Sequence, residues 1–75
     1  MRWQEHIVAT PDTLHGTPRF RGTRIPVSVV LDNLAAGVVP DEIRRQYPTL
    51  PEAAISAALA YAADLARDRI VPISA

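Results

Sequence analysis

The sequence predicts a mainly α-helical fold, in which three helices form a helix-turn-helix bundle behind a short N-terminal β-hairpin or arm. Apolar residues recur at helical spacing after residue 26, and Pro and Gly divide that region into three segments. The residues before it combine short apolar runs with turn signals. We therefore expect one domain, with an arm at 1–26, a helix-turn-helix core at 27–68 and a tail at 69–75.

The region before residue 27 carries the signals of a small β structure. A short strand is predicted at 6–9, where an apolar run is closed by the turn residues at 10–12. The segments 19–20 and 23–25 flank Arg21-Gly22, and glycine readily adopts the positive φ that a tight turn needs. We expect a small hairpin or an ordered arm here.

The first helix is predicted to follow Pro26. Its apolar residues have the spacing of a single helix face, at Val27, Val30, Leu31 and Leu34. Ser28 is the predicted N-cap, and Gly37 is the predicted residue just past the helix end.

Two further helices are predicted after Gly37. One runs from Pro40 to Tyr47, because Pro suits a first helical position and the acidic residues that follow complement the positive end of the helix dipole. The other begins at Thr49-Leu50-Pro51-Glu52, which has the spacing of a capping box, and continues to about Arg67.

The third predicted helix is apolar around most of its circumference. Between Ala53 and Ala66, Ser56 and Asp64 are the clearly polar residues, and such a helix is usually buried on more than one side. A chain of 75 residues holds little else to cover it, so we expect a homodimer or a protein partner. The expected interface lies at Ala53, Ala57, Ala60 and Tyr61. Because Ala favours helices and tolerates solvent, an interpretation without a partner is also open.

Composition excludes several classes of function. The sequence has no Cys, which removes disulfides, thiolate zinc sites and a cysteine nucleophile. No apolar run reaches the roughly 18 residues of a membrane span. His6 and His15 lack a second ligand at metal spacing, and Ser28 and Ser56 lack a base partner. We therefore predict a cytoplasmic protein that is not an enzyme and holds no metal or cofactor.

The charge is balanced overall but unevenly distributed. Eight Arg offset eight acidic residues, yet residues 1–30 carry a net charge of +2 and residues 31–75 a net charge of −2. The third helix offers Glu52 and Asp64, which face DNA phosphates unfavourably, so any DNA contact is expected elsewhere. The candidate DNA-binding residues are the arm residues Arg19, Arg21 and Arg24, and the second-helix residues Arg44 and Arg45.

Two of these segments have more than one interpretation. Arg24 either contacts DNA or pairs with an acid or a helix C-terminus. Trp3 is either an anchor for a partner protein or packs on its own domain. The tail at 69–75 alternates weakly and is a candidate edge strand or docking segment.

Several motifs together resemble a known family of bacterial and archaeal proteins. The first is Gly16-x-Pro18-x-x-x-Gly22-Thr23-Arg24-Ile25-Pro26-Val27. It is followed by Leu34-Ala35-Ala36-Gly37, Asp41-Glu42-Ile43, Tyr47-Pro48 and the run Ala57-Ala58-Leu59-Ala60-Tyr61. From about residue 7 to residue 62, the chain resembles domain-of-unknown-function family 433.

This resemblance implies a homeodomain-like helix-turn-helix domain, and many members look like antitoxins of type II toxin–antitoxin pairs. Their usual partner is a toxin resembling the PIN ribonuclease domain, as in VapBC-type systems. The resemblance therefore implies a bacterial VapB-type antitoxin that binds and inhibits such a toxin and represses its own operon by binding operator DNA. Two alternatives remain open at this point, a stand-alone DNA-binding transcriptional regulator and a homodimeric interaction module without DNA binding.

Overall fold

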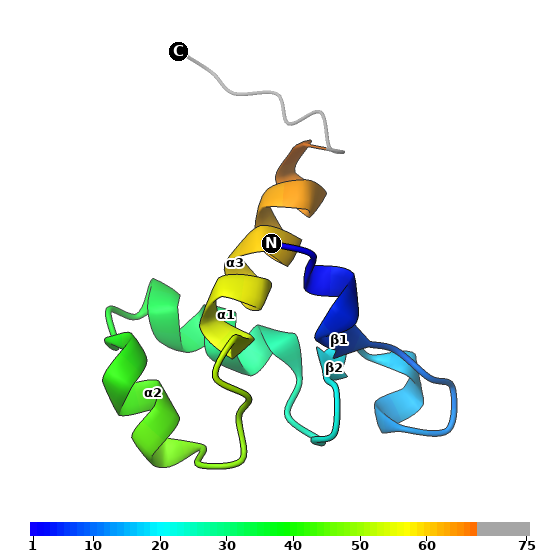
Figure 1. Cartoon of the computed structure of the whole chain (residues 1–75), viewed down its shortest axis with the longest axis horizontal. Helices are drawn as coiled ribbons and strands as arrows, with labels where there is room; N and C mark the ends of the chain where they lie inside the picture. The colour runs from blue at the N-terminus through cyan, green and yellow to red at the C-terminus, as the bar shows by residue number, and fades with distance from the viewer. Residues whose placement is uncertain (68–75) are drawn as a thin grey trace.

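The computed structural model describes residues 1–67 (Figure 1), and these residues form a small helical bundle with a two-stranded antiparallel sheet near the N-terminus. The predicted mainly α fold class is confirmed. The elements in chain order are the 3₁₀-helical turn η1 (Trp3–Glu5), β1 (Ile7–Val8), the 3₁₀-helical turn η2 (Leu14–Gly16), β2 (Arg19–Phe20), α1 (Val27–Ala35), α2 (Pro40–Gln46) and α3 (Ala54–Arg67). The tail predicted at 69–75 lies outside the described residues.

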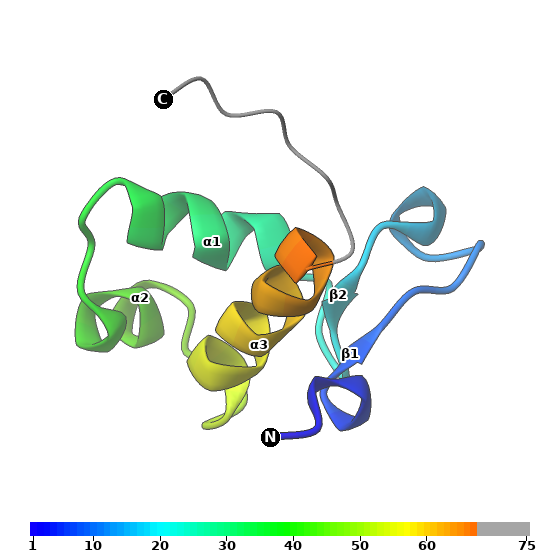
Figure 2. The same ribbon diagram turned by 90° about the horizontal axis from the view of Figure 1, so that it is seen from above.

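Helix α3 is the central element of the fold. It lies between α2 on one side and the β1–β2 pair on the other, and α1 packs across it (Figures 1 and 2). The described part of the chain buries one apolar core, to which both strands and all three helices contribute: Ile7, Phe20, Val27, Val30, Ile43, Ala54, Ile55, Ala57 and Ala58.

The two strands pair in a register that places Arg19 between two other segments. Ile7 faces Phe20 and Val8 faces Arg19 in the antiparallel pair. Arg19 also forms an isolated β-bridge with Pro26 on its other side. The predicted strand at 6–9 is thus confirmed in a shorter form, and the loop 20–25 is closed at its base.

The first helix begins without the predicted cap. Pro26 takes the N-cap position, no side chain caps the helix, and Ser28 lies exposed within the first turn. The prediction of Ser28 as the N-cap is therefore wrong. The Val27 N–H donates to the Pro18 carbonyl at 3.0 Å, so a distant backbone carbonyl satisfies one of the first-turn donors that have no partner within the helix.

The end of α1 follows the prediction. Gly37 has φ of +87°, the left-handed conformation that favours glycine. The Gly37 N–H donates to the Leu34 carbonyl at 3.0 Å, and the Val38 N–H donates to the Asn33 carbonyl at 2.9 Å. These two bonds form a Schellman motif, which satisfies the last carbonyls of the helix and turns the chain toward α2.

The start of α3 differs from the prediction. Helix α2 begins at Pro40 as expected, but α3 begins at Ala54 rather than in the 49–52 segment. Two turns intervene, because the Leu50 N–H donates to the Tyr47 carbonyl and the Ala54 N–H donates to the Pro51 carbonyl, each at 3.0 Å. A run of backbone turns thus replaces the predicted capping box.

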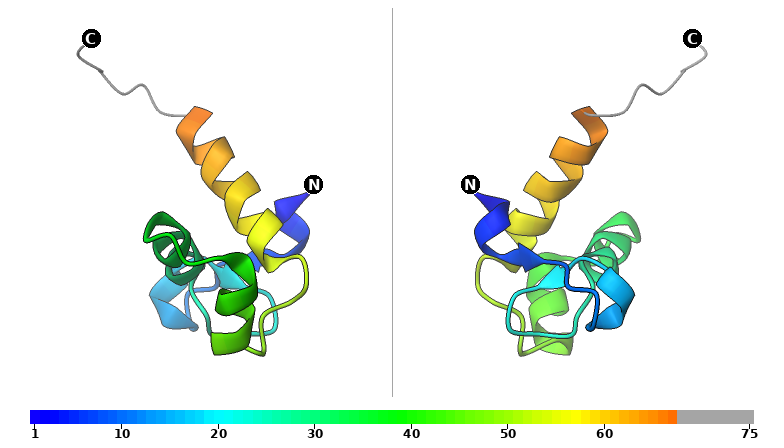
Figure 3. Two further views of the ribbon diagram at one scale, coloured as in Figure 1. Left: turned by 90° about the vertical axis from the view of Figure 1, so that its left-hand side faces the viewer. Right: turned by 90° about the vertical axis from the view of Figure 1, so that its right-hand side faces the viewer.

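The N-terminal segment packs on a face of α3 that the sequence predicts to contact a partner. Turn η1 packs against α3, and α1 covers another side of the same helix. Ala57 is completely buried in the chain's own core, so its prediction as a partner-interface residue is wrong. The C-terminal half of α3 extends beyond the other elements (Figure 3), and Leu65 there remains 42% exposed.

Candidate functional site

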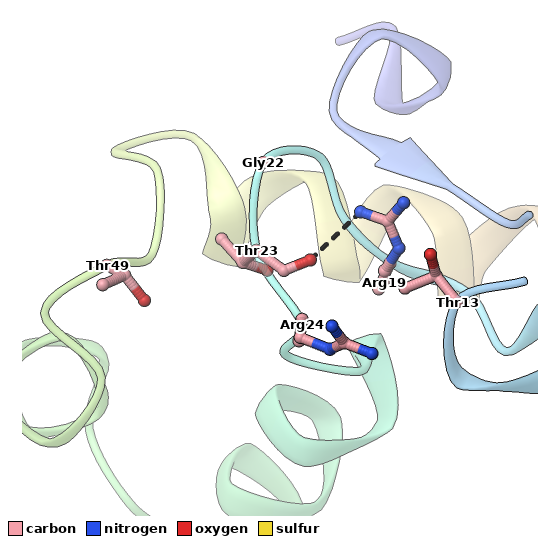
Figure 4. Close-up of a pocket in the computed structure, with 6 residues that line it drawn as sticks. All are labelled: Thr13, Arg19, Gly22, Thr23, Arg24 and Thr49. Atoms are coloured by element: carbon pink, nitrogen blue, oxygen red, sulfur yellow. Dashed lines mark hydrogen bonds between the residues drawn. The ribbon is translucent and has the colours of Figure 1, made fainter.

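A polar pocket of about 450 Å³ opens between the turn that follows β2 and the connection from α2 to α3. Its walls come from segments far apart in the sequence and carry two Arg side chains (Figure 4). None of its lining residues is acidic: Thr13, Arg19, Gly22, Thr23, Arg24 and Thr49. The pocket therefore concentrates positive charge and hydroxyl groups at one place on a chain that is neutral overall.

Arg19 is held in position by the loops around it. Its Nη1 donates to the Thr23 carbonyl at 3.0 Å, and its Nη2 donates to the Thr10 Oγ1 at 3.4 Å. Its Nε is buried and has no hydrogen-bond partner among residues 1–67. A buried N–H of a guanidinium normally has an acceptor, so this donor is unusual.

The turn after β2 brings Arg24 to the rim of the pocket. Gly22 has φ of +78°, which allows the Thr23 N–H to donate to the Phe20 carbonyl at 3.0 Å. The Thr23 hydroxyl donates to the Phe20 carbonyl at 2.8 Å and accepts the Ile25 N–H at 3.1 Å, which fixes the turn.

Arg24 itself is exposed and forms no ion pair within the part of the chain that the structure describes. The alternative in which Arg24 pairs with an acid therefore has no support in residues 1–67. Figure 4 shows its guanidinium on the same side of the pocket as Arg19 and Thr13, with Thr49 on the other side.

The other three predicted DNA-binding residues lie outside this pocket. Arg21 is exposed, and its Nε donates to the Glu5 carbonyl at 3.1 Å. Arg44 pairs with Asp41 at 3.2 Å, and Arg45 pairs with Glu42 at 2.6 Å, both within α2. The structure thus brings Arg19 and Arg24 together and leaves Arg21, Arg44 and Arg45 at other positions on the surface.

Two pocket residues were missed by the sequence analysis. Thr49 belongs to the predicted capping box. Thr13 belongs to no predicted motif, because a lone Thr in a loop forms none. Neither position has a signal in the sequence that identifies it as part of a site. They reach the pocket through the tertiary fold.

An apolar groove of about 250 Å³ lies between α1, α3 and the segment that precedes β2. The half-exposed Leu65 forms part of its wall. Its lining is Thr17, Pro18, Val27, Ser28, Leu31, Tyr61 and Leu65. Of the predicted interface residues, Tyr61 lines this groove, and Ala53 and Ala60 are half-buried.

Trp3 packs on its own domain, which is one of the two alternatives considered for it. Its ring meets that of Tyr61 edge to face, with ring centroids 5.0 Å apart and planes at 85°. Its Nε1 donates to the Asp64 Oδ2 at 2.5 Å. This geometry turns the indole toward α3, so the interpretation of Trp3 as a partner anchor receives no support.

Residues 1–67 contain no group of three His, Cys, Asp or Glu side chains that could hold a metal ion. None of the helices in this described range is long and apolar enough to cross a membrane.

Comparison with known proteins identifies the family. Residues 7–62 match the model of the family described as "Protein of unknown function (DUF433)". The chain belongs to this family. It is 39% identical over 59 residues to the uncharacterized protein y4eO of Sinorhizobium fredii (strain NBRC 101917 / NGR234), and the match covers 79% of this chain and 27% of that protein. The chain thus spans about a quarter of its relative's length. No solved structure matches it.

Protonation of Asp64 is expected to destabilise this DUF433 member at acidic pH. The hydrogen bond from Trp3, followed by that from Arg67, lowers the pKa of Asp64 below its ordinary value of 3.8. A carboxyl with a lowered folded-state pKa stabilises the fold above its unfolded pKa, and that contribution is lost as the pH falls through the folded value. Urea unfolding at a series of acidic pH values measures this loss.

The matched variants for this prediction are Asp64→Asn and Trp3→Phe. The first removes the titrating group, and the second removes the N–H donor while it keeps an aromatic ring against Tyr61. Both are expected to lose less stability than the wild type when the pH falls from about 5 to about 3. Equal acid dependence in the wild type and in Asp64→Asn would contradict the assignment.

Proposed function

We propose that this chain is an antitoxin-like protein of a type II toxin–antitoxin pair, a binding protein rather than an enzyme, which inhibits a PIN-like ribonuclease toxin. The resemblance of its motifs to antitoxin-like members of the family supports the proposal. The observation that carries it is the apolar groove between α1 and α3, where Leu65 remains exposed on a projecting helix end.

The groove has the properties of a surface that binds protein. Its wall combines a proline, aliphatic side chains and Tyr61, and aromatic residues are enriched at protein interfaces. Its occupant in this proposal is an apolar segment of the toxin. Because the proposed toxin and operator are both cytoplasmic, we propose the same location for the chain.

Co-expression with the neighbouring gene tests the proposal. The chain is tagged and produced together with the protein encoded by the adjoining reading frame, and that protein's effect on growth is measured with and without the chain. We expect the two proteins to co-purify and growth to recover. Absence of both effects, with each protein soluble, would refute the antitoxin function.

Operator binding is the second role that we propose, and the pocket around Arg19 and Arg24 supports it. Two guanidinium groups without an acidic neighbour in the pocket lining suit the phosphates of a DNA backbone. The half-buried Asp64 on α3 bonds Trp3 and Arg67, so α3 does not offer it to base edges. A chain that binds its promoter but no neighbouring protein would instead be the stand-alone regulator.

We further propose that the chain forms a homodimer through the face of α3 that contains Leu59. This side chain is 52% exposed, and Ser56 and Ala63, which share its helix face, are also exposed. Sedimentation at micromolar concentration should show a dimer for the wild type and a monomer for Leu59→Glu, because the substitution places a charge in an apolar contact. A monomeric wild type would exclude this dimer.

A further inference from the structure

We propose that the pocket between Arg19 and Arg24 is a binding site for a single phosphate group, with the DNA backbone as its source. The inference rests on the operator-binding part of the proposed function and goes further by limiting the site to one phosphate and by adding the hydroxyls of Thr13 and Thr49 to the two Arg residues. Three features of the pocket lead to it: its charge, its guanidinium and hydroxyl donors, and a lining without aromatic rings, Asn or Gln.

The charge of the pocket is positive and partly fixed in place. Arg19 is bonded to the Thr23 carbonyl and to the Thr10 hydroxyl, so its guanidinium is ordered before any ligand arrives. Arg24 stands at the rim without an ion pair in the described part of the chain. A preformed cation loses little conformational entropy on binding an anion, and a second cation nearby adds to the attraction.

The donors of the pocket lie on opposite walls. The Arg24 guanidinium and the Thr13 hydroxyl lie on the same side of the pocket as Arg19 (Figure 4). The Thr49 hydroxyl faces them from the connection between α2 and α3. The Thr23 hydroxyl is excluded, because it already bonds Phe20 and Ile25. Donors on several sides suit a tetrahedral oxyanion better than a planar carboxylate.

The size and lining of the pocket favour the backbone over the bases of a nucleic acid. A volume of about 450 Å³ leaves room for a phosphate with its ester neighbours. The lining has no aromatic ring to stack on a base and no Asn or Gln to read a base edge. Because Arg19 and Arg24 are both assigned to the phosphate, binding at this contact is expected to be independent of sequence.

The first test uses the chain alone with inorganic phosphate. The Nε–H signals of the Arg side chains and the amide signals of Thr13 and Thr49 are followed by NMR during a titration in a phosphate-free buffer. We expect saturable shifts at Arg19, Arg24 and both Thr residues, and at least tenfold weaker binding in Arg24→Ala. Arg24 is exposed, so this variant is expected to fold.

Arg67→Ala is the matched control, since it removes the same charge at the far end of α3. A helix of 14 residues is about 20 Å long, which exceeds the Debye length of about 8 to 10 Å in physiological salt. The control should therefore keep the affinity of the wild type for phosphate. Shifts spread equally over all Arg signals, or equal losses in the two variants, would overturn the site.

The second test measures binding to a duplex of the upstream DNA at several salt concentrations. Arg24→Ala should reduce the magnitude of the negative slope of log K against log salt by about one, while Arg67→Ala leaves the slope unchanged. If the duplex binds with the same slope in both variants, the pocket assignment is wrong and the proposed operator binding survives. If phosphate saturates the pocket and no duplex binds, the anion site stands and the operator-binding role is refuted.

Discussion

Phe20→Ala is expected to lower the free energy of unfolding of the chain by several kcal/mol. Phe20 is completely buried and is the largest of the fully buried side chains in the described residues. Truncation of a buried Phe to Ala costs about 3 to 5 kcal/mol. A domain of 75 residues has a free energy of unfolding of about 4 to 11 kcal/mol, so the loss takes up much or all of it.

The position of Phe20 makes compensation by local collapse difficult. Its side chain belongs to the core shared by the strands and the helices. Its backbone pairs with Ile7, donates to the Ile25 carbonyl at 3.1 Å and accepts from Thr23. A cavity at this residue therefore lies under the sheet and beside the turn that positions Arg24. Loss of Phe20 should weaken the fold and the polar pocket together.

Urea unfolding followed by circular dichroism measures this effect, with Val39→Ala as the control. Val39 is 62% exposed and lies at no proposed interface, so its truncation removes little buried area and is expected to cost less than about 1 kcal/mol. A cooperative transition in Phe20→Ala with a free energy of unfolding within about 1 kcal/mol of the wild type would contradict the assigned core.

The features that the sequence predicts correctly have local physical causes. Gly37 ends α1 because its positive φ and two backbone hydrogen bonds involve only neighbours along the chain. Pro40 begins α2 for a similarly local reason, since its fixed φ suits the first helical turn. The apolar face of α1 is also correct, because Val27 and Val30 repeat with the helix period and both are buried.

The features that the sequence misses depend on contacts between distant residues. Trp3 and Asp64 are 61 residues apart, and their hydrogen bond closes η1 over α3. No pattern within the helix reveals that η1 packs on it. The sequence therefore predicts a partner interface that includes Ala57, although Ala57 is buried within the chain. The prediction of Ser28 as the N-cap is wrong for a similar reason. Helix α1 begins one residue earlier, at Val27, whose N–H donates to the distant Pro18 carbonyl.

The polar pocket shows how far prediction of the site could go. The sequence places Arg19, Arg21 and Arg24 close together in the arm, but it does not show which of them share a pocket. Arg21 lies between them in sequence and bonds the Glu5 carbonyl instead. Thr49 joins the pocket because the turns before α3 bring it opposite Arg24, as Figure 4 shows. Such a combination becomes visible only in three dimensions.

Leu65→Glu is expected to abolish capture of the proposed toxin while the chain remains folded. Leu65 lines the apolar groove and is 42% exposed, so a charge there can reach water in the free chain at little cost. In a complex the same carboxylate would be buried against an apolar segment without a partner. Loss of a central interface contact costs at least about 2 kcal/mol, or about thirtyfold in affinity.

The comparison with Leu59→Glu makes this prediction specific to the groove. Both substitutions place a carboxylate at a half-exposed Leu on α3, but Leu59 is not among the groove residues. Calorimetric titration with the purified toxin should show a loss of at least thirtyfold in Leu65→Glu and a smaller change in Leu59→Glu. If Leu65→Glu binds as tightly as the wild type, the toxin does not use the groove. If both variants lose binding equally, the loss is not specific to the groove, and the assignment of the toxin to the groove is wrong.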